Sequence, residues 1–263
     1  MKLLQADHVS VTYRIPGRAP LKAVNGVSFE LRPGDSLGIV GESGCGKSTL
    51  ARAIMGLQPL SGGTLSYQGR NIADFNRQEA KEYRRKIQMI FQDAVGSLNP
   101  RMTVRQTLEE TLRVHRMVKP DQIGHRIDEL LDYVGLPGKV LGSYPREMSG
   151  GQCQRVSFAR CLALTPQIIL ADEPVSALDV SVQARILNLI KELQRKLGVT
   201  IVLISHDLAV VRTICEKVSV MYAGEFVESG NTLQVLDHPR HDYTKHLLEA
   251  VPDVGRALRA NGI

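Results

Sequence analysis

A glycine-rich segment near the start of the chain stands between an apolar run and a helical pattern. The apolar run, residues 37–40, has the length of a buried strand, and the stretch 47–57 repeats large apolar residues at helical spacing. Glycines between the two let the backbone curl so that its N–H groups point inward, where the positive end of the next helix dipole also lies. This order predicts a phosphate-binding P-loop in an α/β fold, with the sequence Gly41-Glu42-Ser43-Gly44-Cys45-Gly46-Lys47-Ser48.

Two side chains at the end of this loop have the chemistry that a nucleoside triphosphate requires. We expect Lys47 to reach the β- and γ-phosphates as a point charge, and the Ser48 hydroxyl to bind the Mg²⁺ that bridges them. With Thr49, the predicted phosphate-binding set runs from Gly41 to Thr49. The alternative is an ordinary glycine-rich turn before a helix, but it does not account for the strand, the loop, the Lys-Ser pair and the helix in this order. ATP and Mg²⁺ are therefore the expected cofactors.

The composition indicates a globular chain and narrows its partners. With 263 residues and 43% apolar content, the chain can bury a substantial core in one or two domains. No apolar run approaches the ~20 residues of a membrane-spanning helix, and the opening residues turn polar too early for a secretory signal, so we expect a cytosolic chain. Its four cysteines lack the paired short spacing of a zinc site or a disulfide framework. The net charge of +6 is mild and the one basic run, 84–86, fits a solvated helix face, so no nucleic-acid partner is expected.

Strand-like runs dominate the first part of the chain. Residues 9–13 alternate as a half-buried strand does, and further strands are expected at 27–31, 64–67 and 87–91, with a charged helix at about 77–86. These strands are expected to lie beside the nucleotide-binding core as an N-terminal antiparallel β subdomain.

From about residue 99 the pattern becomes helical, with no strand before residue 142. An α/β alternation then resumes: strands at 168–171 and 200–205 are separated by helical patterns of ten or more residues, which implies parallel pairing. We therefore predict an α/β fold, namely a P-loop NTPase core with a mainly parallel sheet and an inserted α-helical subdomain at about 99–148.

Two adjacent carboxylates end the buried strand predicted at 168–171. Because side chains alternate in an extended chain, Asp172 and Glu173 should point to different places, which suits two roles. We expect Asp172 to complete the Mg²⁺ shell, and Glu173 to accept a proton from the attacking water. The ordinary alternative is a solvated Asp-Glu pair at a strand end, and the preceding P-loop makes it the weaker interpretation.

A second candidate anion site precedes the next predicted helix. There the hydroxyl of Ser149 and the N–H groups of two glycines stand at a helix N-terminus, in the sequence Met148-Ser149-Gly150-Gly151-Gln152. One chain has little use for two phosphate cradles, whereas two chains facing head to tail can each cover the nucleotide of the other. At this point the sequence resembles the ATP-binding subunits of ABC transporters, whose signature reads Leu-Ser-Gly-Gly-Gln; Met148 replaces leucine and conserves its volume.

The resemblance covers about residues 3–252 and implies roles for further positions. Tyr13 matches the aromatic residue that stacks on adenine, and Gln92 the glutamine that senses the metal and the γ-phosphate. Residues 176–179, Ser-Ala-Leu-Asp, match the loop that crosses the dimer, and His206 matches the switch histidine at the γ-phosphate. Each has an ordinary alternative, respectively a core aromatic, a strand-end polar residue, a helix N-cap and a satisfied histidine. The resemblance implies one ABC ATPase domain over 1–252, followed by a tail, 253–263.

Three segments are similar to the peptide/nickel branch of ABC importers. They are Ser-Leu-Asn-Pro-Arg at 97–101, Ser-Val-Gln-Ala-Arg at 181–185 and His-Pro-Arg-His-Asp-Tyr-Thr at 238–244, where Asp242 replaces the usual proline. Importers of this branch commonly carry two different ATPase subunits, and the strings at 150–155 and 172–179 resemble the second. The resemblance implies a second ABC ATPase subunit in a heterodimer, two membrane permease subunits and an extracytoplasmic solute-binding protein, with this chain at the cytoplasmic face of the cell membrane.

The implied function is ATP-driven head-to-tail dimerisation that energises import of a small solute. These residues do not separate a peptide from nickel or another metal chelate as the cargo; the short stretch after Pro252 inclines the expectation toward nickel. The competing class is a soluble ABC-type ATPase of a cytosolic enzyme complex or of a process linked to nucleic acid. ATPases of the second kind usually have two cassettes or long coiled-coil arms, and this chain has one cassette and no sustained heptads.

Overall fold

The computed structural model describes residues 2–14, 16–17, 19–176 and 178–249, and a six-stranded sheet forms the centre of this part. Its strand order is β10-β9-β3-β8-β7-β6. The strands from β9 to β6 pair in parallel, and β10 pairs antiparallel with β9. The strands are β3 (Ser36–Val40), β6 (Ile87–Ile90), β7 (Ile168–Asp172), β8 (Thr200–Ser205), β9 (Lys217–Tyr222) and β10 (Glu225–Asn231).

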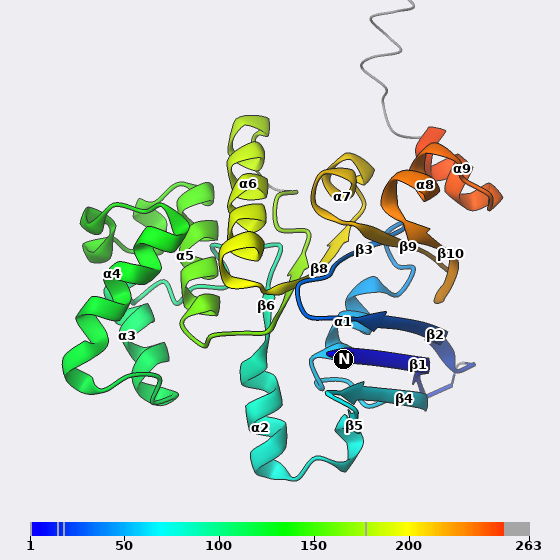
Figure 1. Ribbon diagram of the computed structural model, residues 1–263, viewed down its shortest axis with the longest axis horizontal. Helices are drawn as coiled ribbons and strands as arrows, with labels where there is room; N and C mark the ends of the chain where they lie inside the picture. The colour runs from blue at the N-terminus through cyan, green and yellow to red at the C-terminus, as the bar shows by residue number, and fades with distance from the viewer. Residues whose placement is uncertain (1, 15, 18, 177, 250–263) are drawn as a thin grey trace, which may run out of the picture.

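A second, antiparallel sheet has the order β2-β1-β4-β5. It consists of β1 (Leu4–Tyr13), β2 (Leu21–Leu31), β4 (Gly62–Tyr67) and β5 (Arg70–Asn71). Helix α1 (Lys47–Ile54) belongs to the core shared by the two sheets, because its Leu50 and Ile54 are buried in one cluster with Leu4 of β1 and Ile39 of β3 (Figure 1). The predicted combination of a mainly parallel sheet and an antiparallel one is confirmed.

Helices cover the other face of the parallel sheet. Side chains of β7 alternate between two cores: Ile168 and Leu170 join the cluster that contains α1, whereas Ile169 and Ala171 join a second cluster. That second cluster also holds buried residues of α5 (Gly150–Leu162), α6 (Val180–Leu197) and α7 (Leu208–Ile214). A strand buried on both faces explains the uninterrupted apolar run in its sequence.

The helical stretch of the sequence lies at one side of the molecule, away from the antiparallel sheet (Figure 1). It contains α3 (Val104–Val114), α4 (Ile123–Val134) and 3₁₀ turns at Pro120–Gln122, Gly138–Gly142 and Pro145–Glu147. Thr103 caps α3 through a capping box, and Gly135 ends α4 in the left-handed conformation, φ 62°. The remaining elements are the 3₁₀ turn Ile72–Asp74 and the helices α2 (Arg77–Lys86), α8 (Thr232–Asp237) and α9 (Asp242–Glu249).

Two element ends differ from the sequence prediction. Helix α1 stops at Ile54, because Gly56 adopts φ 65°, and Leu57 is 59% exposed instead of facing the core. Strand β6 ends at Ile90, and Phe91, predicted as its last residue, is 47% exposed. The predicted tail, 253–263, and the end of the predicted domain at 252 lie outside the described residues.

Candidate active site

The neighbours of the P-loop account for two of its glycines. The loop leaves the end of β3 and enters α1, with Gly41 at φ 153° and Gly46 at φ 114°. A Cβ on Gly41 would stand 2.2 Å from the carbonyl oxygen of Met221, and one on Gly46 would stand 2.1 Å from that of Ala23. Since both obstacles are backbone atoms, no side chain can replace these hydrogens without moving β9 or β2. The predicted glycine loop thus has a steric basis within the chain itself.

Lys47, the first residue of α1, points back into the loop. Its ammonium donates to the carbonyl oxygens of Gly41 at 2.7 Å and Glu42 at 2.8 Å, and it lies 3.7 Å from Cys45 Sγ. The residue is only 6% exposed, so its charge is held inside the curve of the backbone. An anion entering that curve would meet a lysine already positioned for it.

The proposed metal ligands Ser48 and Asp172 meet across the end of the parallel sheet. Ser48 Oγ donates to Asp172 Oδ2 at 3.3 Å, so a hydroxyl and a carboxylate converge from α1 and β7. Burial raises the pKa of Asp172 above its ordinary value and the neighbouring charge of Glu173 adds to this effect, while the Ser48 hydrogen bond opposes it. Hard oxygen donors in a partly desolvated position fit Mg²⁺, which would favour the ionised carboxylate.

The Glu173 carboxylate is held from two sides. Gln92 Nε2 donates to its Oε2 at 3.2 Å, and His206 Nδ1 lies 3.0 Å from its Oε1. The Glu173 side chain is 19% exposed and that of His206 is 59% exposed, so the carboxylate is oriented and still within reach of solvent. Gln92 also donates to Ser176 Oγ at 3.2 Å, a contact that sequence reasoning missed. These side chains come from segments that follow β6, β7 and β8, whose ends meet at one edge of the sheet.

The prediction that Asp172 and Glu173 diverge because side chains alternate in an extended chain gives the wrong reason. Strand β7 ends at Asp172, and Glu173 adopts φ 46°, so extended-chain alternation does not apply to it. The N–H of Glu173 donates to Ile204 O at 2.9 Å, which fixes this left-handed residue to β8. A non-glycine residue in this conformation costs of the order of 1–3 kcal/mol, and such strain concentrates at functional sites.

The second predicted anion site is an exposed helix N-terminus apart from the P-loop. Ser149 caps α5 through a capping box: its hydroxyl accepts from Gln152 N at 3.3 Å, and Gln152 Oε1 accepts from Ser149 N at 2.9 Å. Gly151 has a packing role, since a Cβ there would stand 2.5 Å from Val182 Cγ1 of α6. Among the described residues, no hydrogen bond connects 149–152 with residues 41–49.

Tyr13 is the last residue of β1 and is partly buried. Its hydroxyl donates to Gln58 Oε1 at 3.4 Å, and its ring packs against the core shared by the two sheets. The structure therefore leaves part of the ring accessible, and its predicted contact with adenine stays a prediction. Sequence reasoning also gave no role to Tyr243 of α9, whose hydroxyl contacts the P-loop, although the string at 238–244 that contains it had been singled out.

The described part of the chain has neither a cluster of His, Cys, Asp or Glu for a metal ion nor a membrane-spanning helix. It holds no cluster of three or more His, Cys, Asp or Glu side chains with the geometry for a metal ion. In the same residues, none of the helices combines the length and apolar character that crossing a membrane requires. The four cysteines are unpaired and buried.

Comparisons with known proteins identify the family of the chain. A family model described as ABC transporter matches residues 24–176. The oligopeptide transport ATP-binding protein OppF of Haemophilus influenzae is 44% identical over 98% of this chain and 81% of its own length. OppF of Salmonella typhimurium is 48% identical over 88% of this chain and 70% of its own length.

Among solved structures, the ATP-binding cassette MJ0796 in a dimeric post-hydrolysis state bound to ADP and Pi superposes with a TM-score of 0.77. It is 31% identical in sequence, and the match covers 87% of this chain and 98% of that chain. The chain therefore belongs to the ABC transporter family and is one of its ATPase subunits.

Proposed function

We propose that this chain hydrolyses ATP to energise the import of oligopeptides, with Glu173 as the general base. The observation that carries the proposal is the Glu173 carboxylate, held at 3.2 Å by Gln92 and at 3.0 Å by His206 beside the Ser48–Asp172 pair. The relatives reported above have oligopeptide transport in their names, which favours peptides over nickel as the cargo.

The P-loop residues 41–49 bind the phosphates in this proposal. Lys47 Nζ lies within 2.8 Å of two carbonyl oxygens of the loop. When phosphate enters the loop, the lysine exchanges one of these partners for a phosphate oxygen. Ser48 and Asp172 hold Mg²⁺, and Gln92 completes its surroundings. When bound, the metal neutralises charge on the β- and γ-phosphates.

Glu173 takes the proton of the attacking water. The donor from Gln92 occupies Oε2 and His206 occupies Oε1, so both oxygens are oriented, and solvent still reaches the side chain. His206, which lies 3.0 Å from Glu173, is proposed to contact the γ-phosphate when ATP is bound. A positioned general base of this kind contributes about 10²- to 10⁴-fold in rate.

The assembly is proposed to be a head-to-tail pair of ATPase subunits. One ABC ATPase domain spans 1–252, with a helical subdomain at about 99–148 that ends at the signature residues 149–152. The exposed position of Ser149, without a hydrogen bond to the P-loop in the described residues, suits a role toward the nucleotide of a partner. We propose a second, different ATPase subunit as that partner, with two permeases and a solute-binding protein, at the cytoplasmic face of the membrane.

A surface hollow next to Gln92 supports docking of a permease. It measures about 270 Å³, and Met89, Phe91 and Leu164 supply apolar surface to it. Phe91 is 47% exposed and directly precedes Gln92 in the chain. A partner segment that contacts Phe91 would thus be one residue away from Gln92, which donates a hydrogen bond to the Glu173 carboxylate.

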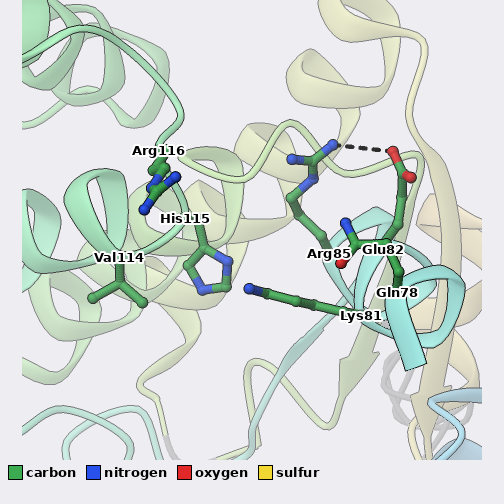
Figure 2. Close-up of a pocket in the computed structure, with 7 residues that line it drawn as sticks. All are labelled: Gln78, Lys81, Glu82, Arg85, Val114, His115 and Arg116. Atoms are coloured by element: carbon green, nitrogen blue, oxygen red, sulfur yellow. Dashed lines mark hydrogen bonds and ion pairs between the residues drawn. The ribbon is translucent and has the colours of Figure 1, made fainter.

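A second pocket, of about 460 Å³, adjoins the first and shares His115 with it. Figure 2 shows Lys81 of α2 pointing toward His115 at the end of α3, and Arg85 directed toward Glu82. The ion pair between Arg85 and Glu82 measures 3.3 Å. Burial, together with the charges of Lys81 and Arg85, lowers the pKa of His115 below its ordinary value. The excess of cations favours a docked segment with an acidic side chain beside its apolar ones.

Reconstituted transport tests the proposed function. The complex that co-purifies with the full chain is placed in vesicles with its binding protein, and ATP-dependent uptake of labelled oligopeptides and of radioactive nickel is measured. We expect permease subunits in the complex and uptake of peptide, abolished by Glu173→Gln. Uptake of nickel alone would overturn the peptide assignment, and co-purification with a soluble enzyme complex would overturn transport itself.

A further inference from the structure

The C-terminal helix of the described chain contacts the P-loop directly. Tyr243 lies in the first turn of α9, and its hydroxyl accepts a hydrogen bond from the backbone N–H of Glu42 at 3.0 Å. The two residues are 201 positions apart in the sequence. The string at 238–244, which the ATPase chemistry leaves without a role, therefore reaches the phosphate-binding loop.

Hydrogen bonds from backbone N–H groups to side chains fix the position of residues 240–243. The carboxylate of Glu228 in β10 accepts from the N–H groups of Arg240 at 2.9 Å and His241 at 3.1 Å. His241 Nδ1 in turn accepts from the N–H of Tyr243 at 3.1 Å. The start of α9 is thus tied to the edge strand of the same sheet whose strand β3 leads into the P-loop.

An aromatic contact aims the Tyr243 phenol at the loop. Its ring lies against Tyr222, the last residue of β9, with centroids 4.3 Å apart and planes at 44°. Partial burial raises the pKa of Tyr243 above its ordinary value, so the group is a neutral phenol at physiological pH. The adjacent Met221 carbonyl is the atom that excludes a side chain at Gly41. The end of β9 and α9 together therefore enclose one side of the P-loop.

We propose that Tyr243 is a positioning residue for ATP binding, acting through the Glu42 N–H. The phenol gives this exposed N–H a fixed acceptor in place of water, and so holds the second residue of the loop in one conformation before the nucleotide arrives. A loop that is already ordered loses less conformational entropy when ATP binds. This inference rests on the proposed role of the P-loop as the ATP site.

Two tyrosine variants of the full chain test it by calorimetric titration with Mg-ATP. Tyr243→Phe removes only the hydroxyl that contacts the loop, and we expect ATP binding to weaken by about 2- to 12-fold, the worth of one net hydrogen bond. Tyr222→Phe is the matched control, since it removes a hydroxyl from the other ring of the same pair and should bind as wild type does.

Kinetics of the assembled complex separate positioning from catalysis. For Tyr243→Phe we expect KM for ATP to rise by a similar factor while kcat changes much less, because Glu173 and His206 are untouched. In hydrogen exchange, ATP should protect the amides of α9 in the wild type and protect them less in the variant.

Wild-type affinity in Tyr243→Phe would overturn the inference, as would equal weakening in both tyrosine variants. If the wild-type chain itself failed to bind Mg-ATP, the proposed function would fall and this inference with it.

Discussion

At the scale of single residues, two neighbouring carboxylates have different surroundings. Asp172 is partly desolvated with one hydroxyl partner, Ser48, whereas Glu173 is oriented by Gln92 and His206. Different environments support the different roles proposed for these adjacent acids, a metal ligand and a base. The motif order in the sequence predicted both roles, but it could not predict φ 46° at Glu173, because that conformation is imposed by the bond to Ile204 of another strand.

Asp172→Asn should expose the energetic cost of the metal site. Because burial raises the pKa of Asp172 in the folded chain, its ionised form opposes folding, and we expect the nucleotide-free variant to be at least as stable as wild type at pH 7. The destabilisation caused by the ionised Asp172 is present above its raised folded-state pKa and disappears as the pH falls below the unfolded value of about 3.9. The difference in unfolding free energy between wild type and variant should therefore narrow on acidification. Urea unfolding at several pH values measures it.

The matched control is Asp179→Asn. A hydrogen bond from Ser181 holds the pKa of Asp179 below its ordinary value, so loss of this charge should not stabilise the chain at pH 7. Asp172→Asn should also lose the Mg²⁺ dependence of ATP binding. A variant clearly less stable than wild type at pH 7 would contradict the view that burial of the ionised Asp172 opposes folding.

Tyr13 tests the predicted adenine contact. If its ring stacks on the base, Tyr13→Ala should weaken ATP binding by about 1–3 kcal/mol, while Tyr13→Phe should bind almost normally, because the ring face supplies the contact. The long 3.4 Å bond to Gln58 makes a large effect of the hydroxyl unexpected. Titration with a fluorescent ATP analogue measures both variants; a Phe variant as weak as the Ala variant would assign the role to the hydroxyl.

At the scale of elements, the pattern of apolar residues predicted the buried strands well, but it predicted the ends of the elements poorly. The predicted strand 200–205 has the bounds of β8, since the interior of a strand buried on both faces is apolar. The pattern placed Leu57 in α1 and Phe91 in β6, but both are exposed, because local backbone geometry ended each element first. The elements after residue 205 were not predicted: α7 is short, and β10 is largely polar.

Gly151→Ala tests the contact between α5 and α6. Its new methyl would stand 2.5 Å from Val182 Cγ1, and we expect a loss of about 1–3 kcal/mol in the free energy of unfolding, as for overpacked cores. Gly124→Ala in α4 is the control: no atom lies within 4 Å of its Cβ position, so it should stabilise the chain by about 0.4–1 kcal/mol. Denaturant unfolding compares them. Equal effects would show that Gly151 is not needed for packing.

At the scale of the whole molecule, the candidate site has two parts that no hydrogen bond joins among the described residues. The P-loop, Asp172, Glu173, Gln92 and His206 gather at one edge of the parallel sheet, and the signature residues 149–152 lie on the helical side. The local sequence predicted two phosphate cradles in one chain, and the resemblance to a family implied that they serve a pair of chains. The contact between Tyr243 and Glu42 was equally beyond the sequence, as it joins residues 201 apart.

Ser149→Arg tests the half-site that faces a partner. The variant should keep its own ATP binding, because Ser149 has no bond to the P-loop in the described residues, yet it should impair closure over the partner's nucleotide by filling the phosphate position with a bulky cation. Ser149→Ala controls for loss of the α5 cap, about 1 kcal/mol. Sedimentation of the ATP-bound pair measures closure; loss of ATP binding by the isolated Arg variant contradicts the head-to-tail arrangement.

The most direct test of the account is the ATP turnover of Glu173→Gln. The variant is assembled with a partner subunit inactivated by its own Glu-to-Gln change, so that only the site of this chain reports. Since glutamine keeps the shape of Glu173 but cannot accept the proton, we expect normal Mg-ATP binding, turnover lower by about 10²- to 10⁴-fold and accumulation of the closed, ATP-bound pair. Turnover at the wild-type rate would contradict the assignment of Glu173 as the general base.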